Sequence, residues 1–315
     1  MSIVILAKDW DADQWAALIR AQEPSREVFP NFTAARRERV RYALAWKPDP
    51  GLLTTFPGLE VIFNLGAGVD AILADETIPK AIPIVRVVDP NLTGRMVEWV
   101  TLSVLFHHRQ MPMYQSQQRQ RLWRDTASQP AASAVTVGIL GFGELGMASA
   151  KILKMLGFPV IGWSRGGRSV EGFECFAGAG DLTGFLSRTD ILVCLLPLTQ
   201  ATRGLLNRDL FAKLKRGGPL GGPVLINAGR GPEQVEEDIL AALDDGILIG
   251  ASLDVFGTEP LPSSSPLWSH PKVVVTPHVG ADSEPALLSR YVLEQIGRHE
   301  CGQPLQNVVD RARGY

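Results

Sequence analysis

Three side chains suited to catalysis lie in the C-terminal half of the chain, each after an apolar run that is typical of a buried strand. They are Arg230, Glu259 and His278. An arginine offers a planar fork of N–H donors that fits a carboxylate and its adjacent carbonyl. A histidine exchanges protons near neutral pH, and a carboxylate beside it holds the second ring nitrogen and favours the charged imidazolium. We therefore predict proton transfer to a small substrate that carries a carboxylate.

Strands must position these three residues, and the runs Val224–Asn227, Gly250–Val255 and Val273–Thr276 precede them. Because parallel strands end at one edge of a sheet, the polar groups that follow are expected to converge there. Taken singly, each residue also has a structural interpretation, since Arg-Gly and Glu-Pro pairs are common in loops. The remaining histidines are interpreted as structural or surface residues: His107, His108, His270 and His299.

The stretch Thr136–Gly146 predicts a nucleotide-binding loop. The apolar run Val137–Leu140 leads into glycines at the G-x-G-x-x-G spacing, namely Gly141, Gly143 and Gly146. The first glycine permits a tight turn, the second lets the backbone approach a pyrophosphate, and the third lets the following helix, expected over Ala148–Leu156, pack closely. The phosphates would bind at the N-terminus of that helix. By itself, the motif is also compatible with a merely tight strand-to-helix connection.

The end of the next strand, Val160–Trp163, indicates which dinucleotide binds. Chains that bind NAD carry Asp or Glu there for the ribose 2′-hydroxyl, whereas this chain carries Ser164 and Arg165, followed by Arg168. Guanidinium groups bind a 2′-phosphate through charge-assisted hydrogen bonds. The cofactor is therefore predicted to be NADP rather than NAD. The alternative is a solvated surface loop that contains two arginines.

A second glycine turn follows the apolar run Val61–Leu65. It reads Gly66, Ala67, Gly68 and leads into a short helical segment at Ala71–Ala74. Backbone amides in such a turn can hold an anion. An ordinary strand-to-helix turn explains the same residues, so both interpretations stay open.

Strands alternate with helices along the whole chain, which predicts a doubly wound α/β fold with parallel sheets. At 315 residues the chain is long enough for two domains. The longest helical pattern runs from Thr93 to about Leu122, and we place a domain boundary near its start. The dinucleotide-binding domain is expected over residues 95–281, and the substrate domain over 1–94 and 282–315. The site is expected in the cleft between them.

Composition excludes several classes of partner. The 31 Lys and Arg residues nearly balance the 33 Asp and Glu residues, so nothing favours nucleic acid or an anionic membrane surface. The three cysteines are far apart, which argues against a disulfide framework and a metal site. The N-terminus is interpreted as a first strand rather than a leader, and no apolar run is long enough to cross a bilayer. We expect a cytoplasmic protein.

The sequence resembles the D-isomer-specific 2-hydroxyacid dehydrogenase family in the stretches NAGRG around Arg230, LDVFGTEPLP around Glu259 and TPHVG around His278. Within that family, LGAGVD, SPLWSHP and the terminal RARGY resemble the glyoxylate/hydroxypyruvate reductase A group. The resemblance implies a Rossmann domain inserted into a smaller flavodoxin-like domain. It also implies that Arg230 binds and polarises a 2-oxoacid, that His278 protonates the carbonyl oxygen, and that Glu259 supports the histidine while the nicotinamide gives a hydride.

The resemblance implies further contacts and an assembly. Substrate contacts would come from Trp46, Ala67 and Gly68; cofactor contacts, besides the glycines and arginines above, from Glu144, Leu145, Leu196, Pro197, Thr202, Ala228 and Asp254. A homodimer would form through the long helix and the dinucleotide domain. The chain departs from the family at Gly217–Gly222, which looks like a small insertion, and at Gly229, where several relatives carry alanine.

Three functions follow from these observations. We favour an NADPH-dependent reductase of small 2-oxoacids such as glyoxylate and hydroxypyruvate. A reductase on the same scaffold for a bulkier 2-oxoacid is the first alternative, because the residues of the pocket cannot be ranked from sequence. A non-catalytic dinucleotide-sensing protein is the second, and the presence of all three catalytic residue types argues against it.

Overall fold

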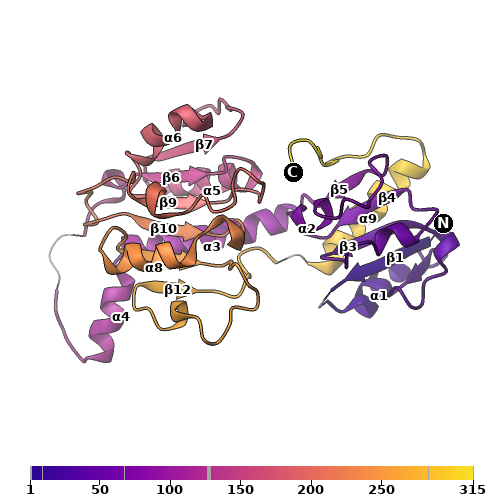
Figure 1. Ribbon diagram of the computed structural model, residues 1–315, viewed down its shortest axis with the longest axis horizontal. Helices are drawn as coiled ribbons and strands as arrows, with labels where there is room; N and C mark the ends of the chain where they lie inside the picture. The colour runs from indigo at the N-terminus through magenta and orange to yellow at the C-terminus, as the bar shows by residue number, and fades with distance from the viewer. Residues whose placement is uncertain (1, 9, 67, 126–128, 283, 315) are drawn as a thin grey trace. The chain divides into compact units, whose positions relative to one another are not determined.

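The computed structural model describes residues 2–8, 10–66, 68–125, 129–282 and 284–314 (Figure 1). It divides into two compact units, Met1–Leu92 with Ser283–Tyr315, and Thr93–Asp282. Each unit is built on a wholly parallel sheet with helices on its faces. The predicted doubly wound α/β class is therefore confirmed.

The first unit contains a five-stranded sheet in the order β2-β1-β3-β4-β5. Its strands are β1 (Ser2–Ala7), β2 (Glu27–Phe29), β3 (Val40–Trp46), β4 (Val61–Asn64) and β5 (Ile84–Arg86). This order is that of the flavodoxin-like fold. The three-residue strand β2 was not predicted, because so short a segment shows no periodicity of its own.

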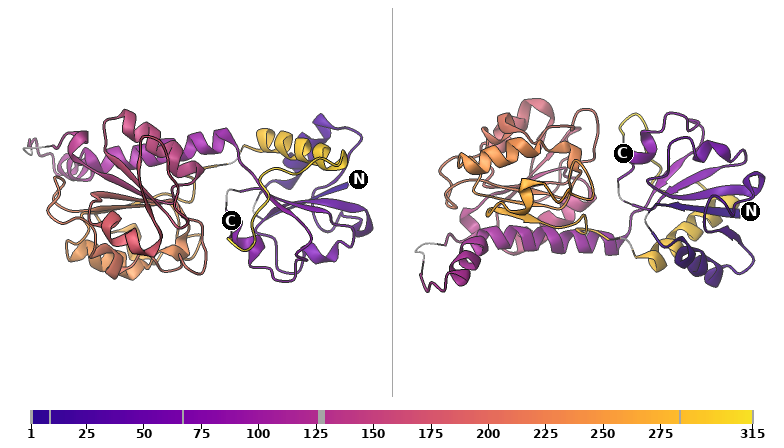
Figure 2. Two further views of the ribbon diagram at one scale, coloured as in Figure 1. Left: turned by 90° about the horizontal axis from the view of Figure 1, so that it is seen from above. Right: turned by 60° about the horizontal axis from the view of Figure 1, so that its bottom comes forward.

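Helices α1 (Ala12–Gln22) and α9 (Pro285–Glu300) cover one face of this sheet (Figure 2). The side chain of Asp11 accepts a hydrogen bond from the Gln14 N–H, which satisfies one of the free donors at the start of α1. Two short helical segments cover the other face: η2 (Leu53–Thr55) and α2 (Asp70–Leu73). A further segment, η1 (Arg37–Arg39), precedes β3 and buries no residue. Trp15 on α1 and Val292 on α9 are buried in the same cluster.

The second unit contains a seven-stranded sheet in the order β12-β11-β10-β9-β6-β7-β8. Its strands are β6 (Val137–Leu140), β7 (Val160–Ser164), β8 (Glu174–Ala177), β9 (Ile191–Cys194), β10 (Val224–Asn227), β11 (Gly250–Leu253) and β12 (Val273–Val275). The strand order reverses between β6 and β9. In doubly wound sheets, ligands bind outside the carboxyl ends of the strands at this reversal.

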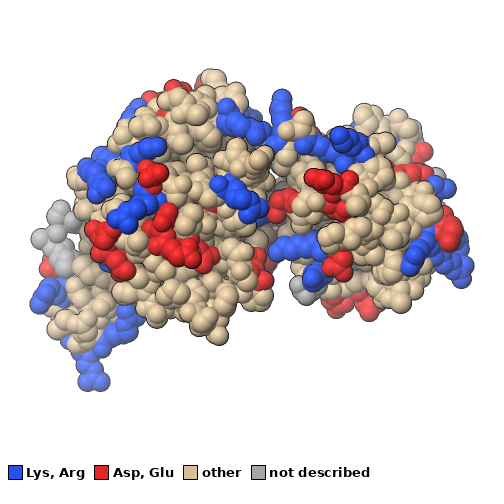
Figure 3. Space-filling model, viewed as in Figure 1, with Lys and Arg blue, Asp and Glu red and all other residues tan. Residues whose placement is uncertain are grey.

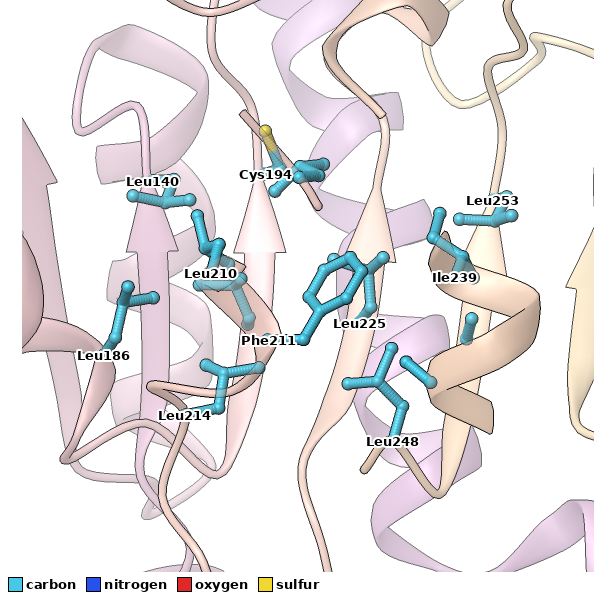
Figure 4. Close-up of a cluster of buried hydrophobic side chains, with 14 of the residues drawn as sticks. Leu140, Leu186, Cys194, Leu210, Phe211, Leu214, Leu225, Ile239, Leu248 and Leu253 are labelled. Atoms are coloured by element: carbon cyan, nitrogen blue, oxygen red, sulfur yellow. The ribbon is translucent and has the colours of Figure 1, made fainter. Parts of the chain in front are cut away.

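Apolar side chains from both faces of this sheet meet helices. One face packs against α6 (Gly178–Leu186), α7 (Arg208–Phe211) and α8 (Glu236–Asp244), and Figure 4 shows Phe211 and Leu225 among the side chains of that cluster. The opposite face packs against α3 (Pro90–His108) and α5 (Glu144–Met155). The central strands β6, β9, β10 and β11 are buried on both faces, which explains their nearly continuous apolar sequences. The sheet is consequently a rigid base for the loops at its carboxyl edge.

The prediction of one helix from Thr93 to about Leu122 was wrong. Helix α3 ends at His108, and a separate helix α4 runs over Met111–Arg119. Between them Gln110 adopts a left-handed conformation with φ of 55°. Pro112 explains the break, because proline has no N–H for the preceding turn and its ring would clash with the carbonyl four residues earlier, so it is tolerated only where a helix begins. No residue of α4 is buried.

Helix α3 buries a histidine whose titration is coupled to folding. His107 is 6% exposed, and its Nε2 lies 2.9 Å from Ser252 Oγ on β11. Burial lowers the pKa of His107 from its ordinary value of 6.5 to about 4. The neighbouring His108 packs edge-on against Phe158, and burial followed by the charge of Arg109 lowers its pKa. Both imidazoles are therefore neutral in the folded protein at neutral pH.

We expect the protein to lose stability in mild acid because of His107. The pKa of His107 is lower in the folded protein than in the unfolded chain, so the unfolded chain takes up the proton first. The free energy of unfolding is therefore unaffected by this group above pH 6.5 and decreases as the pH falls towards 4. The loss from this one group is about 2 kcal/mol at pH 5. Urea unfolding at neutral pH and at pH 5 measures it. His107→Gln, which keeps a donor for Ser252, should show a smaller pH effect; equal pH effects in both proteins would contradict the prediction.

Within the described ranges, no helix is long and apolar enough to cross a membrane. On the face drawn in Figure 3, Lys and Arg side chains are interspersed with Asp and Glu. Among the residues that the structure describes, no group of three or more His, Cys, Asp or Glu side chains could hold a metal ion.

Candidate active site

The predicted acid–base pair is assembled in the second unit. His278 Nδ1 lies 2.9 Å from Glu259 Oε2. The other carboxylate oxygen, Glu259 Oε1, accepts a hydrogen bond from the Phe256 N–H at 3.1 Å. The side chains of His278 and Glu259 are 31% and 24% exposed, so neither is isolated from solvent. Because Nδ1 faces the carboxylate, Nε2 is the ring nitrogen through which His278 can reach a substrate.

A buried carboxylate fixes the backbone that carries His278. Asp254, 1% exposed, accepts hydrogen bonds from Thr276 Oγ1 at 2.5 Å and from the N–H groups of Val279 and Gly280 at 3.0 and 2.9 Å. The His278 N–H donates to the Asp254 carbonyl at 2.8 Å. Burial raises the pKa of Asp254, and the hydrogen bonds from Thr276 and the two amides act in the opposite direction.

These contacts explain how His278 keeps an unusual backbone conformation, with φ of 55°. Residues other than glycine rarely adopt this region and hold it only where surrounding contacts determine it. Thr276 is held in turn by Trp99 on α3, whose Nε1–H donates to Thr276 Oγ1 at 3.1 Å. Sequence reasoning assigned Asp254 to the cofactor and missed Thr276 and Trp99. A hydroxyl at the end of an otherwise apolar strand was the available signal for Thr276.

Arg230 lies on a tight turn directly after β10. The Asn227 side chain, fully buried, accepts the Gly229 N–H at 3.0 Å, and Arg230 Nη1 donates to the Gly229 carbonyl at 2.8 Å. Gly231 is packed so closely that an added Cβ would collide with the Phe256 carbonyl. Phe256 is the residue whose N–H binds Glu259. The turn that carries Arg230 is therefore in contact with the segment that holds the acid–base pair.

The glycine loop has the geometry of a dinucleotide cradle. Gly141 has φ of +97°, and a side chain there would collide with the Leu195 carbonyl. A Cβ at Gly146 would collide with the Gly141 carbonyl, so close packing of α5 requires glycine. Gly143 differs, because a Cβ added there would meet nothing within 4 Å. That open space next to the first turn of α5, which starts at Glu144 and Leu145, fits the approach of a pyrophosphate.

The other predicted cofactor residues follow the neighbouring strand ends. Ser164 ends β7, and Arg165 and Arg168 are exposed just after it, on a turn that includes Gly167 with φ of +69°. After β9, Thr202 Oγ1 donates to the Pro197 carbonyl at 2.8 Å and closes a loop that begins at the buried Leu196. Ala228 follows β10 and is 7% exposed. All of them lie beyond carboxyl ends of the seven-stranded sheet.

Trp46, Gly66 and Gly68 belong to the first unit. The ring of Trp46 packs over Gly66, where an added Cβ would collide with it. Ala67 lies outside the described residues. Asn64, 2% exposed at the end of β4, donates from Nδ2 to the carbonyls of Gly66 at 2.5 Å and Gly68 at 3.0 Å. Sequence reasoning missed Asn64, although a polar residue ending an apolar strand was a visible signal.

Comparisons with known proteins agree with one another. Residues 101–280 match the family profile "D-isomer specific 2-hydroxyacid dehydrogenase, NAD binding domain". The chain is 37% identical to "Glyoxylate/hydroxypyruvate reductase A" of Yersinia enterocolitica and 38% identical to the protein of that name from Klebsiella pneumoniae strain 342, with complete coverage of both chains in each case.

Two solved structures are similar over the whole chain. The NADPH-dependent glyoxylate/hydroxypyruvate reductase of Sinorhizobium meliloti, in complex with NADP and sulfate, has a TM-score of 0.93 and 47% identity, covering 100% of this chain and 99% of that one. A probable 2-hydroxyacid dehydrogenase of Rhizobium etli, in complex with NADP, HEPES and L(+)-tartaric acid, has a TM-score of 0.92 and 46% identity with the same coverage.

Proposed function

Because the chain belongs to the D-isomer specific 2-hydroxyacid dehydrogenase family, we propose that it uses NADPH to reduce the small 2-oxoacids glyoxylate and hydroxypyruvate to their 2-hydroxyacids. The observation that carries the proposal is the contact of His278 with Glu259, 2.9 Å apart, beside the turn that presents Arg230. The relatives named above support the choice of substrate. The family and the Rossmann-type cofactor domain agree with the expectations from sequence.

In this proposal the protein's side chains perform the binding and proton-transfer steps. Arg230 binds the carboxylate of the 2-oxoacid and directs a guanidinium N–H towards the neighbouring carbonyl oxygen, which makes the carbonyl carbon more electrophilic. The bound reduced nicotinamide supplies the hydride that this carbon accepts. His278 donates the Nε2 proton to the developing alkoxide, and the Glu259 carboxylate stabilises the imidazolium before the transfer.

The residues at the carboxyl edge fit the dinucleotide. Open space above Gly143 and the start of α5 accommodate the pyrophosphate. Arg165 and Arg168 replace the carboxylate that would bind a 2′-hydroxyl, and they suit the 2′-phosphate of NADP instead. The structures from Sinorhizobium meliloti and Rhizobium etli, which hold NADP, support this preference.

A substrate panel tests the proposal. Loss of NADPH absorbance is followed with glyoxylate, hydroxypyruvate and phenylpyruvate, and we expect the two small acids to give the higher kcat/KM. A higher kcat/KM with phenylpyruvate would favour the reductase of bulkier acids. Cofactor binding without turnover of any 2-oxoacid would favour the dinucleotide-sensing protein.

Arg165→Asp should shift the cofactor preference towards NADH. A carboxylate at this position repels the 2′-phosphate and accepts a hydrogen bond from the 2′-hydroxyl of NADH. We expect the ratio of kcat/KM for NADPH to that for NADH to fall by about 10- to 100-fold, the effect of losing one hydrogen bond to a charged group. Arg216→Asp makes the same charge change on an exposed residue before β10, at the other edge of the sheet, and should leave the ratio unchanged. An unaltered ratio in Arg165→Asp would contradict the proposed 2′-phosphate contact.

We further expect a homodimer in the cytoplasm. Helix α4 buries no residue, and beyond it Leu122 is 45% exposed and Trp123 fully exposed. Large apolar side chains of this kind commonly mark contact surfaces. Sedimentation equilibrium should report twice the chain mass of 34.2 kDa; a monomer mass would contradict the assembly.

A further inference from the structure

The turn that presents Arg230 rests on a carboxylate with no exposed surface. Glu233, three residues later in the short helical segment η4 (Gly231–Glu233), has a relative exposure of 0%. Its Oε2 accepts the backbone N–H of Arg230 at 3.0 Å. A carboxylate buried to this extent is unusual because of its desolvation cost. Because this carboxylate binds the backbone of the proposed substrate-binding residue, it can affect how that residue is positioned.

Gly229 and Cys194 both lie against the Glu233 carboxylate. A Cβ added at Gly229 would collide with Glu233 Oε2, so glycine at this position makes room for the carboxylate. The Cys194 thiol, at the end of β9, lies 3.5 Å from that oxygen. Burial raises the pKa of the Cys194 thiol, which therefore keeps its proton and donates it to the carboxylate. The Glu233 carboxylate therefore explains why this chain carries glycine at position 229, where several relatives carry alanine.

The remaining polar side chains of the turn extend the network towards the acid–base pair. Asn227 Nδ2 donates to Gln234 Oε1 at 2.8 Å, and Gln234 Nε2 donates to the Val255 carbonyl at 2.9 Å. Val255 lies between Asp254, which holds the segment of His278, and Phe256, which binds Glu259. The backbone on both sides of Arg230 is therefore tied to the segment that positions the proton donor.

We propose that Glu233 is a positioning residue for 2-oxoacid reduction: its buried carboxylate holds the Arg230 backbone so that the guanidinium is aimed at the substrate. The proposal rests on the proposed function of Arg230. Without the carboxylate, the Arg230 N–H loses its partner and the turn can relax into the space that Glu233 leaves. A shift of about 1 Å in a substrate-positioning group can lower the rate by about 100-fold.

Three substitutions separate position from charge. Glu233→Gln keeps an acceptor oxygen at the same distance from the main chain, and should stay within about threefold of the wild type in kcat/KM for glyoxylate. Glu233→Asp keeps the charge but withdraws the oxygen by one methylene, and Glu233→Ala removes it. Both should lose about 10- to 100-fold, with a raised KM for glyoxylate and an unchanged KM for NADPH. A merely unstable protein would lose kcat without this change in KM.

Hydrogen–deuterium exchange of peptides covering residues 228–234 supplies a readout that does not depend on turnover. We expect faster exchange in Glu233→Asp and Glu233→Ala, and wild-type protection in Glu233→Gln. An unchanged KM for glyoxylate in Glu233→Asp, or a loss in Glu233→Gln as large as in Glu233→Ala, would overturn the proposal. If the wild-type protein reduced no 2-oxoacid, the proposed function would fail. Independently of turnover, unchanged exchange in Glu233→Asp would show that Glu233 does not hold the Arg230 turn in place.

Discussion

Replacement of His278 by alanine is expected to lower kcat for glyoxylate reduction by about 10²- to 10⁴-fold, the usual contribution of a positioned general acid. The structure supports this role because Glu259 holds Nδ1 at 2.9 Å, so that Nε2 is the ring nitrogen that can face a substrate. The main-chain contacts of the neighbouring segment with Asp254 do not involve the imidazole ring. The variant should consequently fold and bind NADPH normally, and single-turnover kinetics would show the loss in the chemical step.

His270→Ala is a matched control for this prediction. His270 also lies beside a carboxylate, with Nε2 3.4 Å from Asp244 Oδ1, but it precedes β12 and so lies at the opposite edge of the sheet from His278. Its replacement should leave kcat unchanged. Glu259→Gln removes the charge that stabilises the imidazolium and keeps a hydrogen-bond acceptor, so its kcat should fall between those of the wild type and His278→Ala. A kcat for His278→Ala within a few-fold of the wild type would exclude the histidine as proton donor.

The fold was predictable wherever a pattern lay within one segment. Runs such as Val224–Asn227 occupy the strands expected of them, because burial on both faces of a parallel sheet selects continuous apolar sequence. The strand β8, Glu174–Ala177, was missed because its residues are exposed or only partly buried and so lack that signature. The break between α3 and α4 was missed because helical composition continues across it. Only Pro112 marked the new start.

The residues of the candidate site likewise fall into those that could be proposed from sequence and those that could not. Arg230, Glu259 and His278 could be proposed from sequence because their chemistry, and the strands before them, are visible there. Glu233 gave no signal, since a polar side chain a few residues from a motif is ordinarily solvated. Asn64 was visible as a polar residue at the end of an apolar strand, but its partners were not. The burial of both side chains follows from tertiary packing, which brings Cys194 against Glu233 and the glycine turn against Asn64. Such supporting contacts depend on which loops the sheet places side by side.

Replacement of Arg230 by alanine is expected to lower kcat/KM for glyoxylate by about 10²- to 10⁴-fold, because two hydrogen bonds between charged groups are lost, each contributing about 1.5–3 kcal/mol. KM for NADPH should change little, since the glycine loop and the two arginines proposed to hold the phosphates of the cofactor follow other strands, β6 and β7. Arg208→Ala is the control, because Arg208 pairs with Asp245 on the surface and should be silent.

Arg230→Lys separates the effect of the two parallel N–H donors of the guanidinium from the effect of its positive charge. Lysine restores a positive charge but not the two parallel N–H donors, so we expect it to recover only part of the lost kcat/KM. Full activity in Arg230→Lys would mean that a point charge is sufficient, and an unaffected Arg230→Ala would remove the arginine from the mechanism. Added guanidinium ion gives the sharpest separation of the two proposed roles. It should restore activity to Arg230→Ala, where a planar donor is missing, and not to His278→Ala, where the missing group is a proton donor.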